Sequence, residues 1–260
     1  MLAVTDAEIA RWLGELVWPL IRGLALFAFA PAFGSSAVPA PVKVALGLAV
    51  AAIIGGIAGP MAPLDLSWHT ATLVIEQILV GGAIGFAMRL TLSVMAFAGD
   101  LSGLQMGFGF ATLLNPQVGV PMPALADFFD LLGTVLFLAI GGHLLLIAAL
   151  VKSFAIVPVS AAAGIVPAGW GALAAAGSAL FQLGMVLALP VVAAMLAINI
   201  AMAVVSRVAP QLNIMSVGFA VFLWTGIAAT ALLMPFVAPA VEHLVEVGLR
   251  LIETVLRGGG

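Results

Sequence analysis

Ionisable side chains inside apolar stretches are the residues of this sequence best suited to chemistry. A charge at membrane depth is costly, and such residues often mark proton paths, ion paths or intramembrane pairs. The candidates are Glu76, Arg89, Asp127, Asp130 and His143. Glu76 and Arg89 are 13 residues apart, so on one straight helix they point to roughly opposite faces. We therefore expect each to meet a partner on another helix or another chain.

The other three candidates have simpler explanations than chemistry. Asp127 and Asp130 follow the segment "VPMP" and fall in the first turns of the helix expected after it. Acidic side chains in that position are stabilised by the helix dipole. His143, in "GGHLLL", is compatible with a proton relay, but a hydrogen-bonded histidine packed between helices is the simpler interpretation.

Motifs for catalysis or metal binding do not occur in the sequence. The chain has no cysteine, which excludes disulfides, thiolate metal sites and cysteine nucleophiles. G-x-S-x-G, H-E-x-x-H, Walker and dinucleotide motifs are absent, and the histidines are far apart. The segment "EHLVE" at 242–246 is explained by the polar face of an amphipathic helix over about 240–257. We therefore expect no catalysis, no cofactor and no metal.

The composition places the chain in a membrane. Of its 260 residues, 64% are hydrophobic and 7% are charged, and the mean hydropathy is +1.31. A soluble domain carries about 25% charged residues. The net charge of −3 and the scattered basic residues argue against nucleic-acid binding. We expect no signal peptide, a single integral membrane domain over 1–257, and a flexible tail at 258–260.

Apolar stretches divide the chain into six segments, each near or above the roughly 20 residues that span a bilayer core of about 30 Å. They lie at about 12–33, 42–58, 71–98, 124–151, 171–205 and 214–241. Because helices satisfy their own backbone hydrogen bonds in lipid, the predicted fold is all-α. The third segment can continue as helix to about Gly107, and Pro190 is expected to kink the fifth. The predicted architecture is therefore one of long, kinked helical hairpins.

Glycines at four-residue spacing indicate close contacts between helices. Gly81 and Gly85 form one such pair, and Gly99, Gly103 and Gly107 form two in succession. In lipid, small residues at this spacing allow two backbones to approach closely. We therefore predict that these glycines lie at helix–helix interfaces.

The connector "GLQMGFGFATLLNPQVGVPMP" at 103–123 combines features that ordinary connectors lack. Gly107 and Gly109 permit unusual backbone angles, and Pro116 prevents a continuous helix. Irregular backbone at membrane depth is tolerated only inside protein or beside a cavity. Its large apolar side chains include Met106, Phe108, Phe110 and Met122. Deformable apolar side chains can close a pore, so the connector is either a plug or an ordinary packed loop.

Several segments, in order, resemble one protein family. They are "PLIRGLALFAFAP…AVPAPVKVALGLA" (19–49), "GLQMGFGFATLLNPQ" (103–117), "LFLAIGGHLLLI" (136–147), "ALPVVAAMLAINIAMAVVSRVAPQLNIMSVGF" (188–219) and "LLMPFVAPAVEHL" (232–244). The chain is similar over nearly its whole length to the FliR family. These are export-gate membrane proteins of flagellar type III secretion, related to the SctT family of injectisomes.

The resemblance implies a function that composition alone does not. FliR-like proteins join FliP and FliQ homologues in a helical hetero-oligomer that conducts unfolded proteins across the bacterial inner (cell) membrane, at the flagellar basal body. FlhB and FlhA are the expected neighbours. Neither catalysis nor a cofactor is expected, because export is powered elsewhere in the machine.

The resemblance also assigns a role to the connector. The lumen-blocking loop of the family falls on Met106–Met122 of this chain, with Phe108 and Phe110 as its apolar contributors. Asn115 stands where an acidic residue is expected before Pro116. Gly141 stands where an asparagine is often found before "GHL".

Two other functions are weighed against an export-gate subunit. A small-solute secondary transporter would also have broken helices and intramembrane charges. An intramembrane hydrolase would require paired aspartates or a Ser/His pair between facing helices, whereas the aspartates here lie near the ends of segments. A transporter should act alone or as a simple oligomer, whereas an export-gate subunit should be inert by itself.

Overall fold

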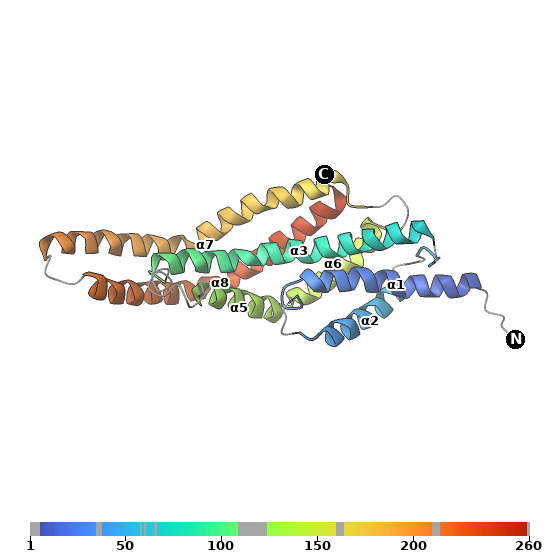
Figure 1. Ribbon diagram of the computed structural model, residues 1–260, viewed down its shortest axis with the longest axis horizontal. Coiled ribbons are helices and arrows are strands. Elements are labelled where there is room, and N and C mark those ends of the chain that lie inside the picture. Colours follow the sequence, from blue (N-terminus) through green and yellow to red (C-terminus); the bar gives the residue numbers. More distant parts are fainter. Residues whose placement is uncertain are drawn as a thin grey trace. The chain divides into compact units, whose positions relative to one another are not determined.

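The computed structural model describes residues 6–34, 38–57, 59, 61–64, 67–108, 124–159, 164–209 and 214–258. Within these ranges every regular element is a helix (Figure 1). The helices are α1 (Asp6–Phe29), α2 (Ala40–Ile57), α3 (Trp68–Gln105), α5 (Ala124–Ala139), α6 (Gly142–Ile156), α7 (Pro167–Val208) and α8 (Ile214–Arg257). The prediction of an all-α membrane protein is therefore confirmed.

The helices correspond to the six apolar stretches of the sequence. Among the described residues, five helices are long and apolar enough to cross a membrane, and α5 with α6 makes a sixth candidate. Helix α3 extends to Gln105, close to the predicted end near Gly107. Its most apolar window is 61% buried, against 17% for that of α7. Helix α3 is therefore the most enclosed of the long helices.

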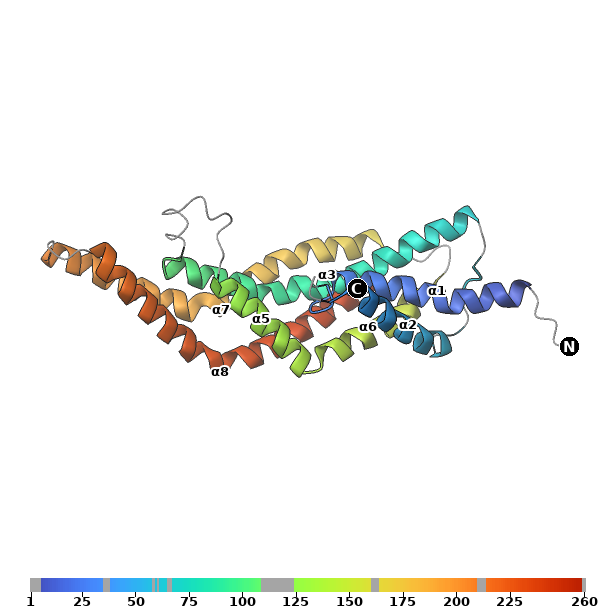
Figure 2. The ribbon, with the colours of Figure 1, turned by 60° about the horizontal axis from the view of Figure 1, so that its bottom comes forward.

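The fourth apolar stretch was expected to form one helix, and this expectation was wrong. Helices α5 and α6 are separated by a bend of 68° (Figure 2). Gly141 lies at the bend with φ +75° and ψ +18°, a left-handed conformation that side chains with a Cβ rarely adopt. The backbone N–H of Leu144 then donates to the Gly141 carbonyl and begins α6. A single glycine therefore turns one apolar run into two helices.

Prolines do not end the long helices. Pro190 lies inside α7, and Pro235 and Pro239 lie inside α8, yet each helix continues past them. Helix α7 begins at Pro167, where a missing N–H costs nothing because the first turn has free donors. The amphipathic segment over about 240–257 is the end of α8 rather than a separate helix.

Contacts within the chain separate two compact units, each with its own core. Unit 1 comprises residues 1–91, 138–177 and 245–260, and unit 2 comprises residues 92–137 and 178–244. The largest fully buried side chains of unit 1 include Trp18, Arg22, Phe27, Ile54 and Met88. Those of unit 2 include Met95, Met106, Phe129 and Phe137. The single domain over 1–257 stays a prediction.

In unit 1, α1 and α3 touch through their backbones. A Cβ added at Gly81 would lie 2.1 Å from the carbonyl oxygen of Arg22. One added at Gly85 would lie 2.4 Å from the carbonyl oxygen of Leu26. Both distances are far shorter than a van der Waals contact, so only glycine fits at either position. This close approach brings the Arg22 side chain into the interior of unit 1.

Candidate functional site

A buried arginine joins three helices of unit 1. Arg22 of α1 is 0% exposed. Its Nε and Nη2 donate to the side-chain oxygen of Gln77 of α3, at 2.8 and 2.5 Å. Its Nη1 donates to Ser153 Oγ of α6, at 2.9 Å, and its Nη2 donates to the Val157 carbonyl, also at 2.9 Å. The guanidinium carbon lies 3.9 Å from the ring centroid of Phe154.

These contacts explain how a charge is tolerated in an apolar interior. A buried ion loses several kcal/mol of hydration, and no carboxylate pairs with Arg22 in the described part of the chain. Four hydrogen bonds and a cation–π contact replace the lost water. The Val157 carbonyl follows the last turn of α6, where a positive charge is favourable. Arg22 therefore holds α1, α3 and the end of α6 in one arrangement.

Sequence reasoning missed Arg22 as a site residue. The available signal was an arginine in the middle of the first apolar stretch, with no acidic residue three or four positions away. An arginine so placed must find its partners on other helices. Gln77, an uncharged residue in another apolar stretch, gave no separate indication.

The structure places two predicted intramembrane charges on α3, within unit 1. Glu76 is half-buried, and its Oε2 is enclosed without a hydrogen-bond partner among the described residues. Arg89 is exposed, and its Nη1 lies 3.2 Å from the position a Cβ would take on Gly34, in the turn after α1. Within the described ranges the two side chains are not ion-paired with each other.

The remaining candidates lie apart from one another. Asp127 is exposed in the first turn of α5, and Asp130 is exposed about one turn later. His143 of α6 is half-buried, and its Nδ1 has no partner in the described part of the chain. The described residues contain no group of His, Cys, Asp and Glu side chains that could hold a metal ion.

The end of α3, in unit 2, is closed by a Schellman motif. The N–H of Phe108 donates to the Gly103 carbonyl, and the N–H of Gly107 donates to the Leu104 carbonyl, both at 3.2 Å. Gly107 has φ +86°, the left-handed conformation that this motif needs. The Phe108 ring also lies 3.5 Å from the position that a Cβ would take on Gly103, so the ring packs beside the last turn of the helix. Gly107 is thus a helix cap rather than a packing residue.

Helices α3 and α5 approach closely at Gly99. A Cβ there would lie 2.6 Å from the Leu125 carbonyl oxygen and 2.8 Å from the Ala126 Cα. Gly103 faces Leu125 at an ordinary distance of 3.5 Å. This contact sets the first turn of α5 beside the end of α3.

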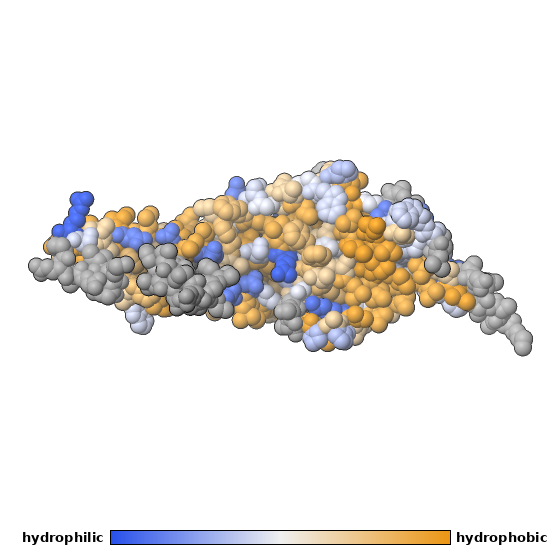
Figure 3. All heavy atoms as spheres, in the orientation of Figure 1, coloured by the Kyte–Doolittle hydropathy of each residue, from blue (hydrophilic) through white to orange (hydrophobic). Residues whose placement is uncertain are grey.

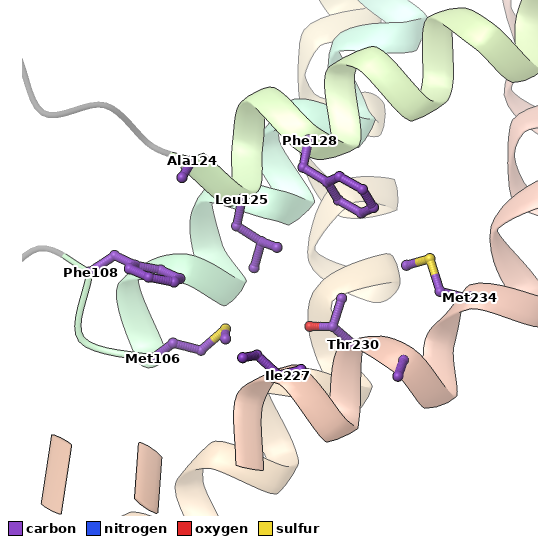
Figure 4. A pocket seen from close by; sticks show the side chains of 9 residues that line it. Met106, Phe108, Ala124, Leu125, Phe128, Ile227, Thr230 and Met234 are labelled. Atoms are coloured by element: carbon purple, nitrogen blue, oxygen red, sulfur yellow. The ribbon is translucent and has the colours of Figure 1, made fainter. Parts of the chain in front are cut away.

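An apolar groove lies beside this junction. Its volume is about 350 Å³, and its lining comes from the end of α3, the start of α5 and the middle of α8 (Figure 4). The lining residues are Met106, Phe108, Ala124, Leu125, Phe128, Ile227, Thr230, Ala231 and Met234. Thr230 is 9% exposed, and its Oγ1 has no hydrogen-bond partner among the described residues. The groove is therefore apolar with one unpartnered hydroxyl in its wall.

The described part of the connector is its base. Met106 and Phe108 belong to the groove, and Gly107 caps α3. The predicted positions Gly109, Phe110, Asn115, Pro116 and Met122 lie outside the described residues.

Comparison with known proteins identifies the family. The family model described as "Bacterial export proteins, family 1" matches residues 13–247, which include Arg22, the end of α3 and the groove. The chain belongs to this family. The FliR family named from the sequence segments is therefore the correct one.

Relatives support this membership over nearly the whole length of the chain. The flagellar biosynthetic protein FliR of Pectobacterium carotovorum subsp. carotovorum is 38% identical over 260 residues, 98% of each chain. FliR of Escherichia coli (strain K12) is 39% identical over 245 residues, 94% of this chain and 93% of its own. FliR of Bacillus subtilis (strain 168) is 28% identical over 204 residues. As a FliR-family protein with several apolar helices, the chain is a membrane-embedded component of flagellar export.

Proposed function

We propose that this chain is a non-catalytic core subunit of the flagellar type III protein export gate in the bacterial inner membrane. With FliP and FliQ homologues it forms a hetero-oligomeric channel for unfolded flagellar substrates, and FlhB and FlhA homologues are its neighbours. The segment 106–122 acts as the plug of that channel. The proposal involves no nucleic acid and no cofactor.

The exposed apolar surface of the long helices carries the proposal. Helices α7 and α8 have 42 and 44 residues. At 1.5 Å per residue such helices measure about 63–66 Å, roughly twice the 30 Å of a bilayer core. Phe181, Leu189, Ile200 and Val208 lie along α7 and are between 54% and 80% exposed. Figure 3 shows apolar side chains over much of the visible surface.

Lipid can cover only part of such a surface. The apolar side chains beyond the bilayer core would face water, and soluble surfaces rarely tolerate large contiguous apolar patches. Helices of other subunits cover them in the assembly that we propose. This requirement supports a gate built from several proteins rather than a subunit working alone.

The base of the connector supports the role of a plug. Met106 and Phe108 line an apolar groove where α3 ends. A seal against ions must be apolar, because an apolar constriction excludes water. It must also deform when a polypeptide passes, and methionine is the most adaptable apolar side chain.

A small-solute secondary transporter is the second candidate. The bend at Gly141 favours it, since transporters place solutes at broken helices. The groove does not favour it, because its lining offers one hydroxyl and no charged side chain. The two functions differ in the oligomeric state that they require.

Co-expression tests the proposal directly. The chain, with an affinity tag, is expressed with the FliP and FliQ homologues of its own bacterium, purified in detergent and weighed by native mass spectrometry. We expect one large complex of fixed stoichiometry that contains all three proteins. Recovery of a stable monomer in the presence of both partners would contradict the export-gate function.

Deletion of residues 108–118 tests the plug separately. Liposomes that contain the assembled complex are loaded with potassium, and its release is followed with an electrode. The deletion should leave assembly intact and raise the leak, because it removes the proposed seal. An unchanged leak in a fully assembled complex would show that the segment is not the plug, while the function of the complex would stand.

A further inference from the structure

The side chain of Met106 lies lengthwise across Gly226 of α8. A Cβ added at Gly226 would lie 2.3 Å from Met106 Cγ, 2.5 Å from Cε and 2.7 Å from Sδ. All three distances are too short for real atoms, so any other residue at 226 would displace the whole methionine. Met106 is 1% exposed, and both residues belong to unit 2.

This contact lies at the end of α3. Met106 is the first residue after the helix, and its N–H still donates to the Ser102 carbonyl. The next residue is the left-handed Gly107 of the Schellman motif. The position of Met106 on α8 therefore sets the direction in which the backbone leaves α3.

Two other methionines of α3 also pack on glycines, but less tightly. The nearest atom of Met95 lies 3.0 Å from a Cβ on Gly133, and that of Met88 lies 2.9 Å from a Cβ on Gly248. Neither contact is at a helix end. Among the described residues, the contact at Gly226 is the one in which a methionine lies along a glycine with three of its atoms and also precedes a turn of the backbone.

We propose that Met106 and Gly226 form a clasp that positions the end of α3 in the closed channel, and that the clasp must open for export. This inference rests on the proposed export-gate function. Met106 has the three rotatable bonds needed to leave Gly226, and the adjacent groove of about 350 Å³ offers it room. In the groove its sulfur, a weak acceptor, can meet the hydroxyl of Thr230, which has no partner among the described residues.

A disulfide tests whether the clasp must open. The natural chain has no cysteine, so M106C/G226C introduces the only pair. Met106 Cγ lies 2.3 Å from a Cβ at Gly226, and its Cβ is one bond further away, within the roughly 4.5 Å that a disulfide spans. Oxidation of the assembled complex should seal the leak and stop export, and reduction should restore export.

Three outcomes of this experiment would overturn the clasp. The first is failure of the disulfide to form in the assembled complex. The second is export that continues, after complete oxidation, as fast as it does in the reduced protein. The third is an oxidised complex that leaks as much as the reduced one. The single variants M106C and G226C, treated with the same oxidant, control for other effects of oxidation.

A double-mutant cycle tests the steric contact without cysteine chemistry. G226A should raise the leak because it displaces Met106, and M106A should raise it because the clasp is gone. In the double variant the added methyl has space and the clasp is already gone, so the leak should equal that of M106A rather than the sum of the two single effects. Purely additive effects would mean that Met106 does not lie on Gly226.

Matched glycine variants separate the clasp from general damage. G248A disturbs a similar methionine contact in unit 1, and G177A meets no neighbouring atom within the described chain. Neither G248A nor G177A should raise the leak of the assembled complex. If G248A raised the leak as much as G226A does, the leak would not depend specifically on the contact between Met106 and Gly226.

The clasp and the proposed function can fail separately. Disulfide formation can also be measured on the chain by itself, whereas leak and export are measured on the assembled complex. If the disulfide forms but FliP and FliQ never join the chain, the contact stands and the proposed function fails. If the complex assembles and exports regardless of oxidation, the function stands and the clasp fails.

Discussion

In unit 1, helices α1, α3 and α6 converge on the guanidinium of Arg22, whereas in unit 2 the end of α3 meets α5 and α8 through methionine and phenylalanine side chains. The first centre is polar, fully enclosed and joined by four hydrogen bonds. The second surrounds an apolar groove whose single hydroxyl, on Thr230, has no partner in the described chain.

The difference separates two kinds of mechanical behaviour. Hydrogen bonds depend steeply on distance and angle, so the contacts of Arg22 permit one arrangement of three helices. Methionine contacts depend weakly on direction, and the side chain can repack in several rotamers. Unit 1 therefore has the properties of a rigid scaffold, and unit 2 has those of a part that can change shape.

Conservative substitutions should give the largest contrast between the units. R22K keeps the charge but cannot make the four bonds of the guanidinium, and it leaves buried acceptors unsatisfied. We expect it to destabilise the protein by about 2–4 kcal/mol. M95L, at a fully buried methionine of unit 2, conserves volume and should cost less than about 1.5 kcal/mol.

The stability of both variants is measured by thermal unfolding of the purified complex, with the loss of the native assembly as the signal. Equal losses of stability would abolish the contrast. A stable R22M, in which the buried charge is replaced by an apolar side chain of similar length, would show that packing rather than hydrogen bonding holds unit 1.

Glycine-to-alanine variants at close backbone contacts should give intermediate losses of stability, and they compare the two units directly. G81A forces a methyl against the Arg22 carbonyl, and G99A forces one against the Leu125 carbonyl. Each should cost about 1–3 kcal/mol, with the greater loss at Gly81, where the overlap is deeper. G177A should be neutral or slightly stabilising, because alanine favours helix and nothing lies nearby in the described chain.

The same unfolding measurement ranks these variants. A loss with G99A as large as that with G81A would mean that unit 2 is also rigid where its backbones touch. Its deformable region would then be confined to the groove and the clasp.

The smallest effect is expected from an exposed ion pair of unit 1 that joins two helices. Lys152 of α6 pairs with Glu253 of α8, and both side chains are about half exposed. Surface ion pairs contribute little because water and salt screen them. K152M should therefore leave the unfolding temperature close to that of the natural protein at physiological salt. A large fall would show that the rigidity of unit 1 depends on this pair as well as on Arg22.

Hydropathy by itself predicted the helical segments with few errors. The length of α3 was anticipated because no proline interrupts the third stretch before Gly107. The bend at Gly141 was missed because a glycine in an apolar run is compatible with helix until its φ is known. The continuity of α8 from the sixth apolar stretch into the amphipathic segment at about 240–257 was missed, because the charged residues from Glu242 onward end the apolar run without ending the helix.

The sequence by itself determined that the chain belongs in a membrane, which segments are helices, its family, and which connector departs from the ordinary. These properties follow from hydropathy, local backbone preference and the order of motifs, and none requires knowing which helices touch. Only the tertiary structure decided that Arg22 meets Gln77 and Ser153, and that Met106 lies on Gly226. The partners are 55, 131 and 120 positions apart in the chain, so no local pattern could pair them.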